Sequence, residues 1–322
     1  MPSEFDLIHR YFQWPVNHTD LGGGDDAALI TPTPGHQLAV SADMLVEGRH
    51  FFKNAEPEAL GWKSLAVNLS DIAAMGGVPC WAFLSLALPA VESDWLDGFA
   101  RGFRACANTF DVDLAGGDTT RGPLTINVTI MGEVPTGRAI TRAGAQVGDE
   151  VWVSGQPGRA ALALWHLRDG TALDPTMRDD CMAALHRPQP RTGLGIGLRG
   201  LASAMLDVSD GLLGDLGHIL ASSGVGVRLR EAGLPTAHLL TACGDAGLAH
   251  KACLTGGDDY ELLFTAPAAH HDAVEAAAHT AGVPVHAIGT LVSSDDGCRI
   301  QRISGRMETL EMRGFDHFTP DH

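Results

Sequence analysis

Residues 56–77, EPEALGWKSLAVNLSDIAAMGG, predict an α-helix that organises the first part of the chain. A proline in the first turn, with an acidic residue on either side of it, is typical of a helix N-terminus. Apolar side chains continue at helical spacing as far as Met75, and the glycine pair at 76–77 ends the helix. The stretch therefore predicts one helix of roughly five turns.

One face of this helix is polar. Ser64, Asn68 and Asp71 follow one another at helical spacing and share that face. The other face carries the apolar residues Leu65, Ala66, Leu69, Ile72 and Ala73. A polar stripe can simply face solvent, but this one has short polar side chains and no long charged ones, which indicates a helix that lines a site. We favour the site and keep the solvent-exposed face as the alternative.

Strands and helices alternate on both sides of this helix. Apolar runs predict strands at 38–42, 81–88, 124–134, 150–153, 204–206, 225–229 and 261–265. Helical patterns predict further helices at 94–110, 157–168, 177–185, 211–222 and 270–281. A turn-like segment at 135–138 separates the two series. We therefore expect the α/β class, with mixed sheets and with two domains at 1–137 and 138–322.

The composition restricts the partners of this chain. It has 322 residues, 45% of them hydrophobic, and a formal net charge of −17, so nucleic acid and anionic membranes are poor partners. No Gly-x-x-x-x-Gly-Lys-Ser/Thr motif occurs, which excludes a P-loop. The acidic start is unlike a secretory signal, and no apolar run reaches about eighteen residues. Six scattered cysteines suit reduced thiols, so we expect a cytoplasmic protein without a membrane partner.

Seven aspartates stand at the ends of apolar runs, each beside glycine, serine or threonine. They are Asp25, Asp26, Asp43, Asp71, Asp118, Asp207 and Asp210. Any one of these motifs alone is a common turn, and Asp25 also suits a supporting position. Together they supply the hard oxygen ligands that a Mg²⁺ and phosphate site needs. Because so many anions repel one another without metal, we expect several bridging Mg²⁺ ions.

This pattern points to phosphoryl transfer. ATP adds further negative charge, and the chain has only three lysines, so metal ions and arginine must neutralise the phosphates. The sequence offers no credible Ser-His-Asp or Cys-His nucleophile for a covalent intermediate. We therefore expect the phosphoryl group to pass directly, in line, from ATP to its acceptor.

A set of motifs in a fixed order carries a family resemblance. They are Glu4-Phe5-Asp6-Leu7-Ile8, Gly24-Asp25-Asp26-Ala27, Ser41-Ala42-Asp43, Glu47-Gly48-Arg49-His50-Phe51, residues 63–71, Gly116-Gly117-Asp118-Thr119-Thr120, Arg142-Ala143-Gly144-Ala145, Asp207-Val208-Ser209-Asp210-Gly211, Gly256-Gly257-Asp258-Asp259-Tyr260-Glu261 and residues 313–318. In this order, and over almost the whole chain, they resemble the thiamine-monophosphate kinase family.

The resemblance implies a fold and a reaction. The fold is similar to that of the superfamily shared with aminoimidazole ribonucleotide synthetase. Its N-terminal domain, here 1–137, would bind ATP and Mg²⁺ and pair in a homodimer, and 138–322 would form the C-terminal domain. The reaction would convert ATP and thiamine phosphate to ADP and thiamine diphosphate, as the last step of thiamine diphosphate biosynthesis.

The resemblance also implies roles for single residues. The metal positions are Asp26, Ser41, Ala42 through its carbonyl, Asp43, Asp71, Asp118, Asp207 and Asp210, and we add Asp25 to them. The ATP positions are Gly117, Asp118, Arg142 and Ser209, and the thiamine phosphate positions are His50, Asp258 and Phe315. The residues that we expect to carry catalysis are Asp43, Asp71, Asp118, Arg142 and Asp210.

Three of these positions differ from the residue that the family often has. Asp258 stands in place of glutamate, Ala42 in place of threonine and Phe315 in place of tyrosine. A phenyl ring can still stack on a thiamine ring without the hydroxyl. From the residues alone, His50 suits a surface or capping histidine, Arg142 a loop arginine and Phe315 a core anchor.

Asp259 and Glu261 suit strand-edge acids outside the site.

Two other functions of the chain stay open. One function is that of another ATP-using member of the superfamily, such as a ligase-like cyclase or selenophosphate synthetase. The latter needs a reactive cysteine near its N-terminus, whereas the first cysteine here is Cys80. The other is a non-catalytic acidic protein that binds cations, although the EF-hand spacing Asp-x-Asp-x-Asp-Gly is absent.

Overall fold

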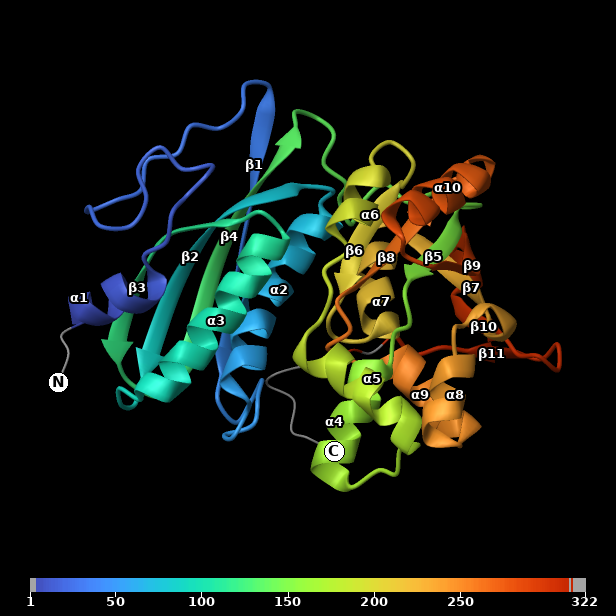
Figure 1. The fold of residues 1–322 in the computed structure, drawn as a ribbon. Coiled ribbons are helices and arrows are strands. Elements are labelled where there is room, and N and C mark those ends of the chain that lie inside the picture. The colour runs from blue at the N-terminus through green and yellow to red at the C-terminus, as the bar shows by residue number, and fades with distance from the viewer. Residues whose placement is uncertain (1–3, 313, 315–322) are drawn as a thin grey trace. The chain divides into compact units, whose positions relative to one another are not determined.

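The computed structural model describes residues 4–312 and residue 314, which form two compact units (Figure 1). Unit 1 consists of Met1–Ile72 and Gly77–Gly137, and unit 2 consists of Ala73–Gly76 and Arg138–His322. The short segment Ala73–Gly76, at the end of the first long helix, therefore belongs with the second unit.

Unit 1 is a four-stranded sheet with helices on one face (Figure 1). Its elements are α1 (Glu4–Leu7), the π-helical turn η1 (Ile8–Phe12), β1 (His36–Val46), α2 (Pro57–Ala74), β2 (Val78–Leu88), α3 (Ser93–Thr109), β3 (Asp113–Arg121) and β4 (Thr125–Pro135). The strand order is β1-β4-β2-β3. Strand β4 pairs antiparallel with β1 and β2, whereas β2 and β3 are parallel and are joined by α3 as a crossover helix.

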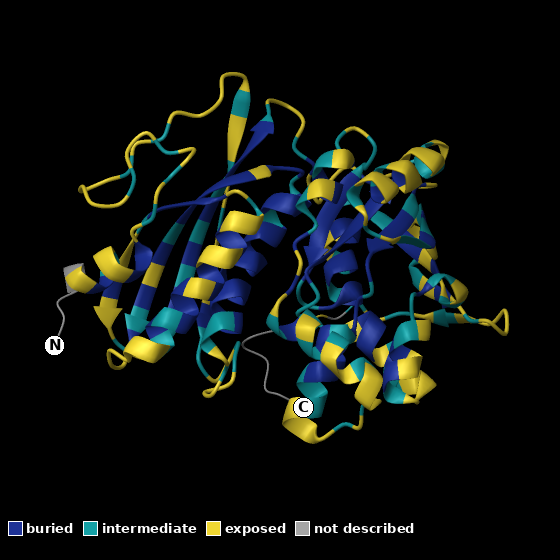
Figure 2. Cartoon of the chain, viewed as in Figure 1, coloured by how far each residue is buried: buried dark blue, intermediate teal, exposed yellow. Residues whose placement is uncertain are grey.

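The core of unit 1 lies between this sheet and its two long helices. The predicted apolar face of β4, which includes Ile126, Val128 and Ile130, is fully buried, as period-two alternation requires. These side chains share one core with the apolar faces of α2 and α3, where Phe99 and Phe103 are the largest fully buried side chains of α3. Figure 2 shows α2 buried along most of its length and α3 exposed on its outer side.

Two glycines let α2 and α3 approach each other closely. A Cβ atom at Gly61 would lie 2.1 Å from the carbonyl oxygen of Phe99, and one at Gly102 would lie 1.8 Å from that of Glu58. No side chain fits at either position without moving a helix backbone. The glycines therefore fix the distance between the two helices, and with it the position of α2 over the sheet.

Unit 2 is built on a seven-stranded sheet with the order β11-β10-β7-β9-β5-β8-β6. Its strands are β5 (Glu150–Ser154), β6 (Ala204–Val208), β7 (Val225–Arg230), β8 (Glu261–Ala266), β9 (Val285–Ser293), β10 (Cys298–Gln301) and β11 (Met307–Thr309). Its α-helices are α4 (Arg159–Asp169), α5 (Pro175–His186), α6 (Thr192–Gly197), α7 (Leu212–Ser223), α8 (Ala237–Cys243), α9 (Ala246–Thr255) and α10 (His271–Ala281). Strands β7 and β10 are parallel, and the other pairs are antiparallel.

Both faces of this second sheet are packed. One face joins a core with helices α4, α5, α7, α8 and α9. The other face carries Trp152 and Phe264, whose rings stack at 6.2 Å, in a core with residues of α6 and α10. A strand that is buried on both faces reads as a continuous apolar run, as β8 does with Leu262, Leu263 and Phe264.

The structure confirms the α/β class with mixed sheets, and it corrects several details. Strand β3, the helices α6, α8 and α9 and the strands β9 to β11 were not predicted, because their sequences are short or lack a clear period. Asp43, Asp118 and Asp207 lie inside strands β1, β3 and β6 rather than after them. Their side chains therefore project from regular strands, which fixes the face on which each one lies.

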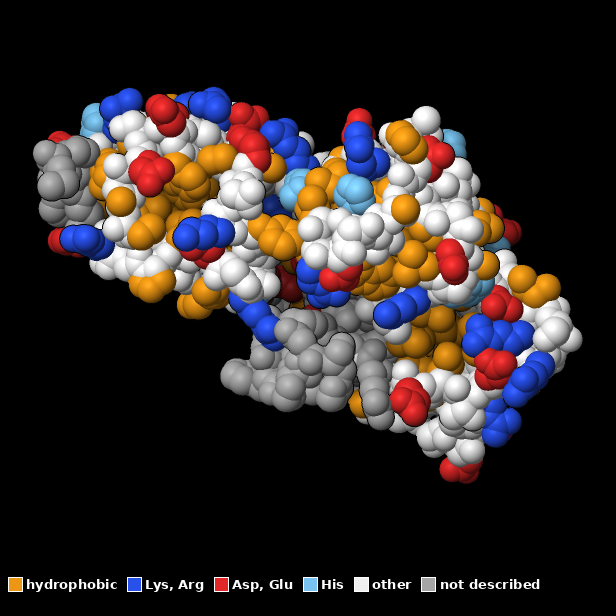
Figure 3. All heavy atoms as spheres, turned by 90° about the horizontal axis from the view of Figure 1, so that it is seen from below, with side chains coloured by type: hydrophobic (Ala, Val, Ile, Leu, Met, Phe, Trp, Pro, Cys, Tyr) orange, Lys and Arg blue, Asp and Glu red, His pale blue; other side chains and the backbone are white. Residues whose placement is uncertain are grey.

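Basic and acidic side chains are interspersed on the surface (Figure 3). Arginine and lysine side chains lie among acidic ones on the face seen in Figure 3, rather than in one basic patch. None of the helices in the described part of the chain has the length and hydropathy needed to cross a bilayer.

Candidate active site

Strand β1 and helix α2 bring four of the polar residues of unit 1 together. The Ser41 hydroxyl donates to Asp71 Oδ2 at 2.6 Å, and the Asp43 backbone N–H donates to Asn68 Oδ1 at 3.0 Å. Ser41 and Asp43 are two residues apart on β1, so both side chains lie on the sheet face that α2 covers. Asn127 of β4 extends the group, since its amide nitrogen donates to the Asp43 carbonyl at 3.1 Å.

The polar stripe of α2 does not face solvent. Ser64 and Asn68 are 1% and 0% exposed, and their side chains bond to carbonyl oxygens one turn earlier in the helix, at 3.0 Å each. Asp71 is half-buried. The solvent-face alternative is therefore wrong, and the stripe places a carboxylate and an amide against the edge strand of the sheet.

The glycine-rich loop that carries Asp25 and Asp26 has its own anchors. Leu21 and Leu29 form a β-bridge across its base, and Gln13 donates to the Gly23 carbonyl at 2.9 Å. The Asp25 carboxylate accepts the Asp26 N–H at 2.8 Å, so it forms a local turn. Both aspartates are exposed, which leaves them accessible to a ligand.

Asp113, at the start of β3, holds the segment that leads into this loop. Its buried carboxylate accepts the N–H groups of Asn17 and His18 at 2.8 and 2.6 Å and the Thr19 hydroxyl at 2.8 Å. The Trp81 indole adds a bond to the His18 carbonyl at 2.9 Å. No local pattern predicts this role, because the partners lie more than ninety residues away.

Gly117 and Asp118 lie on β3, which is an edge strand of the sheet of unit 1. A Cβ atom at Gly117 would lie 1.9 Å from the Leu84 carbonyl oxygen, so only glycine fits there. Gly117 and Asp118 are both exposed. Backbone without a side chain, next to an exposed carboxylate, can approach a phosphate closely.

His50 lies in the tight loop after β1. The Val46 N–H donates to His50 Nδ1 at 3.0 Å. Because a ring nitrogen that accepts a hydrogen bond carries no proton, the ring proton of this arrangement is on Nε2. The histidine therefore caps a backbone amide with one nitrogen and has an N–H donor on the other.

In unit 2 the end of β6 meets the segment before β8. The Asp258 N–H donates to the Ser209 carbonyl at 2.9 Å, and the Tyr260 N–H donates to the Val208 carbonyl at 2.8 Å. The Tyr260 hydroxyl donates to Asp258 Oδ1 at 3.0 Å. Asp258 and Tyr260 have φ values of 67° and 53°, so this turn is held in the left-handed region by its surroundings. Strain of this kind is common at ligand sites.

Asp215, in the first turn of α7, bonds to the backbone of the loop that follows β6. It is 5% exposed, and its Oδ2 accepts the N–H groups of Ser209 and Asp210 at 3.1 Å each. Burial raises the pKa of Asp215 to about 7, and the Asp210 carboxylate adds to the rise, whereas the two amides and the charge of Arg142 lower it. Arg142 itself is exposed. An acid in the first turn of a helix was the available sequence signal for Asp215.

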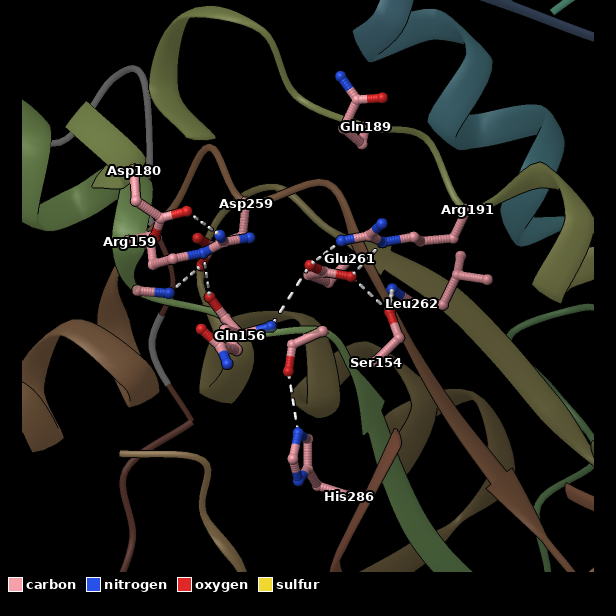
Figure 4. Close-up of polar contacts among 12 residues, drawn as sticks. Ser154, Gln156, Arg159, Asp180, Gln189, Arg191, Asp259, Glu261, Leu262 and His286 are labelled. Carbon is pink, nitrogen blue, oxygen red and sulfur yellow. Dashed lines mark hydrogen bonds and ion pairs between the residues drawn. The ribbon is translucent and has the colours of Figure 1, made fainter. Parts of the chain in front are cut away.

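The acids that follow Asp258 form a buried network around a glycine-rich loop (Figure 4). Glu261 is 2% exposed and accepts two bonds from the Arg191 guanidinium, at 2.7 and 2.6 Å, and one from the Ser154 hydroxyl at 2.6 Å. Asp259 accepts the Gly158 N–H at 2.7 Å, at the N-terminus of α4. Strand β8 lies between β5 and β6, so the interpretation of Glu261 as a strand-edge acid is wrong.

The pKa values of the two acids of this network, Asp259 and Glu261, shift in opposite directions. Burial raises the pKa of Asp259 well above its ordinary value. Burial also disfavours the charged form of Glu261, but the hydrogen bonds and charge of Arg191 outweigh it, and the pKa of Glu261 lies below its ordinary value. Glu261 is therefore a carboxylate at neutral pH and forms a buried ion pair.

The expected site residues are divided between the two units. Unit 1 carries Asp25, Asp26, Ser41, Ala42, Asp43, His50, Asp71, Gly117 and Asp118, and unit 2 carries Arg142, Asp207, Ser209, Asp210 and Asp258. Phe315 lies outside the described residues. Across residues 4–312 and 314, no three His, Cys, Asp or Glu side chains are placed to hold a metal ion by themselves.

Two family models match this chain. The model "AIR synthase related protein, N-terminal domain" matches residues 24–134, and the model "AIR synthase related protein, C-terminal domain" matches residues 146–300. Together with the fold, these two matches define the class: a two-domain protein related to AIR synthase.

Comparisons over the full length identify the family. The thiamine-monophosphate kinase of Salmonella typhimurium is 41% identical over 98% of each chain, and that of Escherichia coli strain K12 is 42% identical over the same shares. The crystal structure of thiamine-monophosphate kinase from Stenotrophomonas maltophilia K279a is 44% identical, with a TM-score of 0.82 over 88% of this chain and 91% of that one. The chain belongs to the thiamine-monophosphate kinase family.

One solved relative is described as a complex with ligands, "AaThiL complexed with AMPPCP and TMP". It is 29% identical to this chain and has a TM-score of 0.77 over 98% of this chain and 96% of that one. The hydrogenase maturation protein HypE of Escherichia coli has a similar TM-score, 0.78, at 22% identity, and shares the fold.

Proposed function

We propose that this chain transfers the γ-phosphoryl group of ATP to thiamine phosphate, which gives thiamine diphosphate and ADP. The observation that carries the proposal is full-length similarity to thiamine-monophosphate kinases, one relative being described with AMPPCP and TMP. The polar group of β1 and α2 is consistent with it, because Ser41, Asp43 and Asp71 offer closely spaced oxygen donors on rigid elements.

The oxygen donors of this chain fit Mg²⁺. This ion usually keeps several waters and is bound by one or two carboxylates together with substrate phosphates, rather than by a cage of protein side chains. Separate carboxylates such as Asp43, Asp71 and Asp118 in unit 1 and Asp207 and Asp210 in unit 2 suit that mode. When bound, the ions would neutralise the phosphate charge that opposes attack of one anion on another.

The acceptor requires no general base. Thiamine phosphate is a phosphate monoester with a second pKa of about 6, so it is already a nucleophilic dianion at neutral pH. The chain then has to orient two anions and exclude water, which favours direct in-line transfer. Gly117, Ser209 and Arg142 would hold ATP in this scheme, with Arg142 supplying a fixed positive charge.

The acceptor would be held by His50, Asp258 and Phe315. The Nε2 proton that the contact with Val46 assigns to His50 makes this residue a donor to an anionic oxygen. Asp258 is oriented by the Tyr260 hydroxyl and can pair with a cationic heterocycle. Phe315 can stack on that ring.

We also propose a homodimer through the outer face of the unit 1 sheet. Strand β1 points Ser41 and Asp43 toward α2, and its alternate residues Leu38, Val40 and Met44 are 42%, 57% and 55% exposed. An exposed apolar row on an edge strand suits pairing with a second copy of the chain. A cytoplasmic location suits the need for ATP and the six free cysteines.

The test is a product assay. Purified protein with ATP, Mg²⁺ and thiamine phosphate is expected to form thiamine diphosphate and ADP in equal amounts, followed by chromatography. Unphosphorylated thiamine should not be accepted, because it has a neutral hydroxyl in place of the nucleophilic phosphate dianion. Formation of ADP without thiamine diphosphate, or phosphorylation of thiamine itself, would overturn the proposal.

A further inference from the structure

A single oxygen atom joins helix α7 to the loop that precedes it. Asp215 Oδ2 accepts the backbone N–H groups of both Ser209 and Asp210, at 3.1 Å each. These are successive residues between the end of β6 and the start of α7. Two neighbouring amides that converge on one acceptor fix the orientation of the peptide between them, and hence the directions in which the Ser209 and Asp210 side chains leave the backbone.

Asp215 is buried, and two loop amides donate hydrogen bonds to its carboxylate. Gly211, the N-cap of α7, has a φ of 108° and turns the chain sharply, so that the first turn of the helix lies beneath the loop. The Asp215 side chain is 5% exposed, so it does not contact bulk solvent as a surface acid would. A buried carboxyl costs free energy unless it is hydrogen-bonded, and the two loop amides supply those bonds.

The loop is held from its other side as well. The Ser209 carbonyl accepts the Asp258 N–H at 2.9 Å, and the Val208 carbonyl accepts the Tyr260 N–H at 2.8 Å. Asp215 therefore fixes the amides of residues 209 and 210, while the segment before β8 fixes the carbonyls of residues 208 and 209. Without Asp215 one of these two sets of constraints is lost, although the strand below is unchanged.

We propose that Asp215 is a positioning residue for nucleotide binding, which acts through Ser209 and Asp210 and touches no ligand itself. This inference rests on the proposed function, in which Ser209 contacts ATP and Asp210 a Mg²⁺ ion. Because both bonds end on one oxygen, the role requires an acceptor at that point and not a second oxygen or a negative charge. An asparagine with its carbonyl oxygen in the same place performs it, whereas a leucine of similar volume does not.

The test compares Asp215→Asn and Asp215→Leu in the full chain. The dissociation constant of a non-hydrolysable ATP analogue with Mg²⁺ is measured by calorimetry, and KM for each substrate is measured by product assay. Loss of two hydrogen bonds is expected to weaken analogue binding about tenfold in Asp215→Leu and to raise KM for ATP by a similar factor. Asp215→Asn should stay within about threefold of the wild type. KM for thiamine phosphate should change little in either variant.

A matched control separates positioning from stability. Asp149 is buried in the same unit, and its carboxylate accepts the Gln146 N–H at 2.9 Å and the Ser203 hydroxyl at 2.6 Å. Asp149→Leu should lower Tm without weakening analogue binding. Equal weakening in Asp149→Leu and Asp215→Leu, or wild-type binding by a folded Asp215→Leu variant, would overturn the inference.

A measurement on the wild type covers the case in which Asp215→Leu does not fold. The amides of Ser209 and Asp210 are expected to exchange slowly with deuterium in the absence of nucleotide, since both are bonded. Exchange at the rate of an exposed loop would refute the positioning role. A wild type that binds the analogue but makes no thiamine diphosphate would instead contradict the proposed function and leave the role of Asp215 standing.

Discussion

The Ser41 hydroxyl donates a 2.6 Å hydrogen bond to Asp71 Oδ2, and this bond joins strand β1 to helix α2. A carboxylate that accepts such a bond is held in one orientation. Residue 43 is tied to the same helix through Asn68. Two carboxylates expected to hold metal thus come from one strand and one helix whose spacing is fixed by core packing.

Substitution of either carboxylate should remove activity and keep the fold. Asp71→Asn and Asp43→Asn retain the side-chain size and lose the negative charge. Both are expected to lower kcat by at least about a hundredfold, with little change in Tm or circular dichroism. Asp97→Asn, on the exposed side of α3, is the matched control and should keep full activity. Wild-type turnover in Asp71→Asn or Asp43→Asn would contradict the assigned roles.

Asp113→Ala should loosen the segment that leads to the Asp25 and Asp26 loop. The substitution removes a buried acceptor from two amides and a hydroxyl, and is expected to lower the free energy of unfolding by about 3 kcal/mol. Hydrogen exchange should accelerate over residues 17–26. A change in unfolding free energy below about 0.5 kcal/mol would show that Asp113 is not the anchor.

The buried pair of Arg191 and Glu261 should be strongly coupled to stability. Arg191→Met leaves the Glu261 carboxylate buried and unpaired, so a loss of about 3–5 kcal/mol is expected in urea unfolding. The control is Arg101→Met, which breaks the exposed pair with Glu58 and should change stability little. Equal effects of the two substitutions would refute a special role for the buried pair.

The same pair predicts a direction of pH dependence. The pKa of Glu261 lies below its ordinary value in the folded state, so the unfolded state takes up its proton first as the pH falls. The contribution is complete above the ordinary carboxyl pKa and is lost as the pH falls through the lowered one. The stability difference between the wild type and Glu261→Gln is therefore expected to be largest at neutral pH and to shrink in acid. A difference that grows in acid would contradict this assignment.

The proposed dimer depends on the exposed apolar row of β1. Val40→Asp places a charge in the centre of that row and should convert a dimer to a monomer in light scattering after size exclusion. Leu240→Asp, at an apolar residue of α8 that is 43% exposed, should leave the mass unchanged. A wild type that is monomeric at all concentrations would rule out the dimer.

Sequence patterns predicted the elements whose period is strong. Helix α2 was expected at 56–75 and is observed at Pro57–Ala74, because its caps and its apolar face agree. Strand β3 was missed, since Gly116-Gly117-Asp118-Thr119-Thr120 has no apolar alternation and becomes a strand by pairing with β2. The strand propensity of a short segment does not show which other strand it will pair with.

The supporting residues of the site were the hardest to foresee. Asp113 and Glu261 act on groups about seventy or more positions away, so their roles exist only once the chain has folded. Asp215 is closer to its partners, but sequence alone does not show which of the many acids in helix first turns is buried. Asp71, by contrast, lies on a helix that periodicity predicts, whereas Asp43 lies inside β1, beyond the end of the predicted strand 38–42.

In the proposed function, dispersed carboxylates hold divalent cations that let thiamine phosphate attack ATP. The most direct test measures the rate of thiamine diphosphate formation against free Mg²⁺ at saturating ATP. We predict no turnover in the presence of a chelator and full recovery when Mg²⁺ is restored. Because several ions are expected, the rate should continue to rise with free Mg²⁺ after every ATP molecule has bound one ion. Turnover by chelator-treated enzyme at the untreated rate would show that the reaction does not depend on these cations.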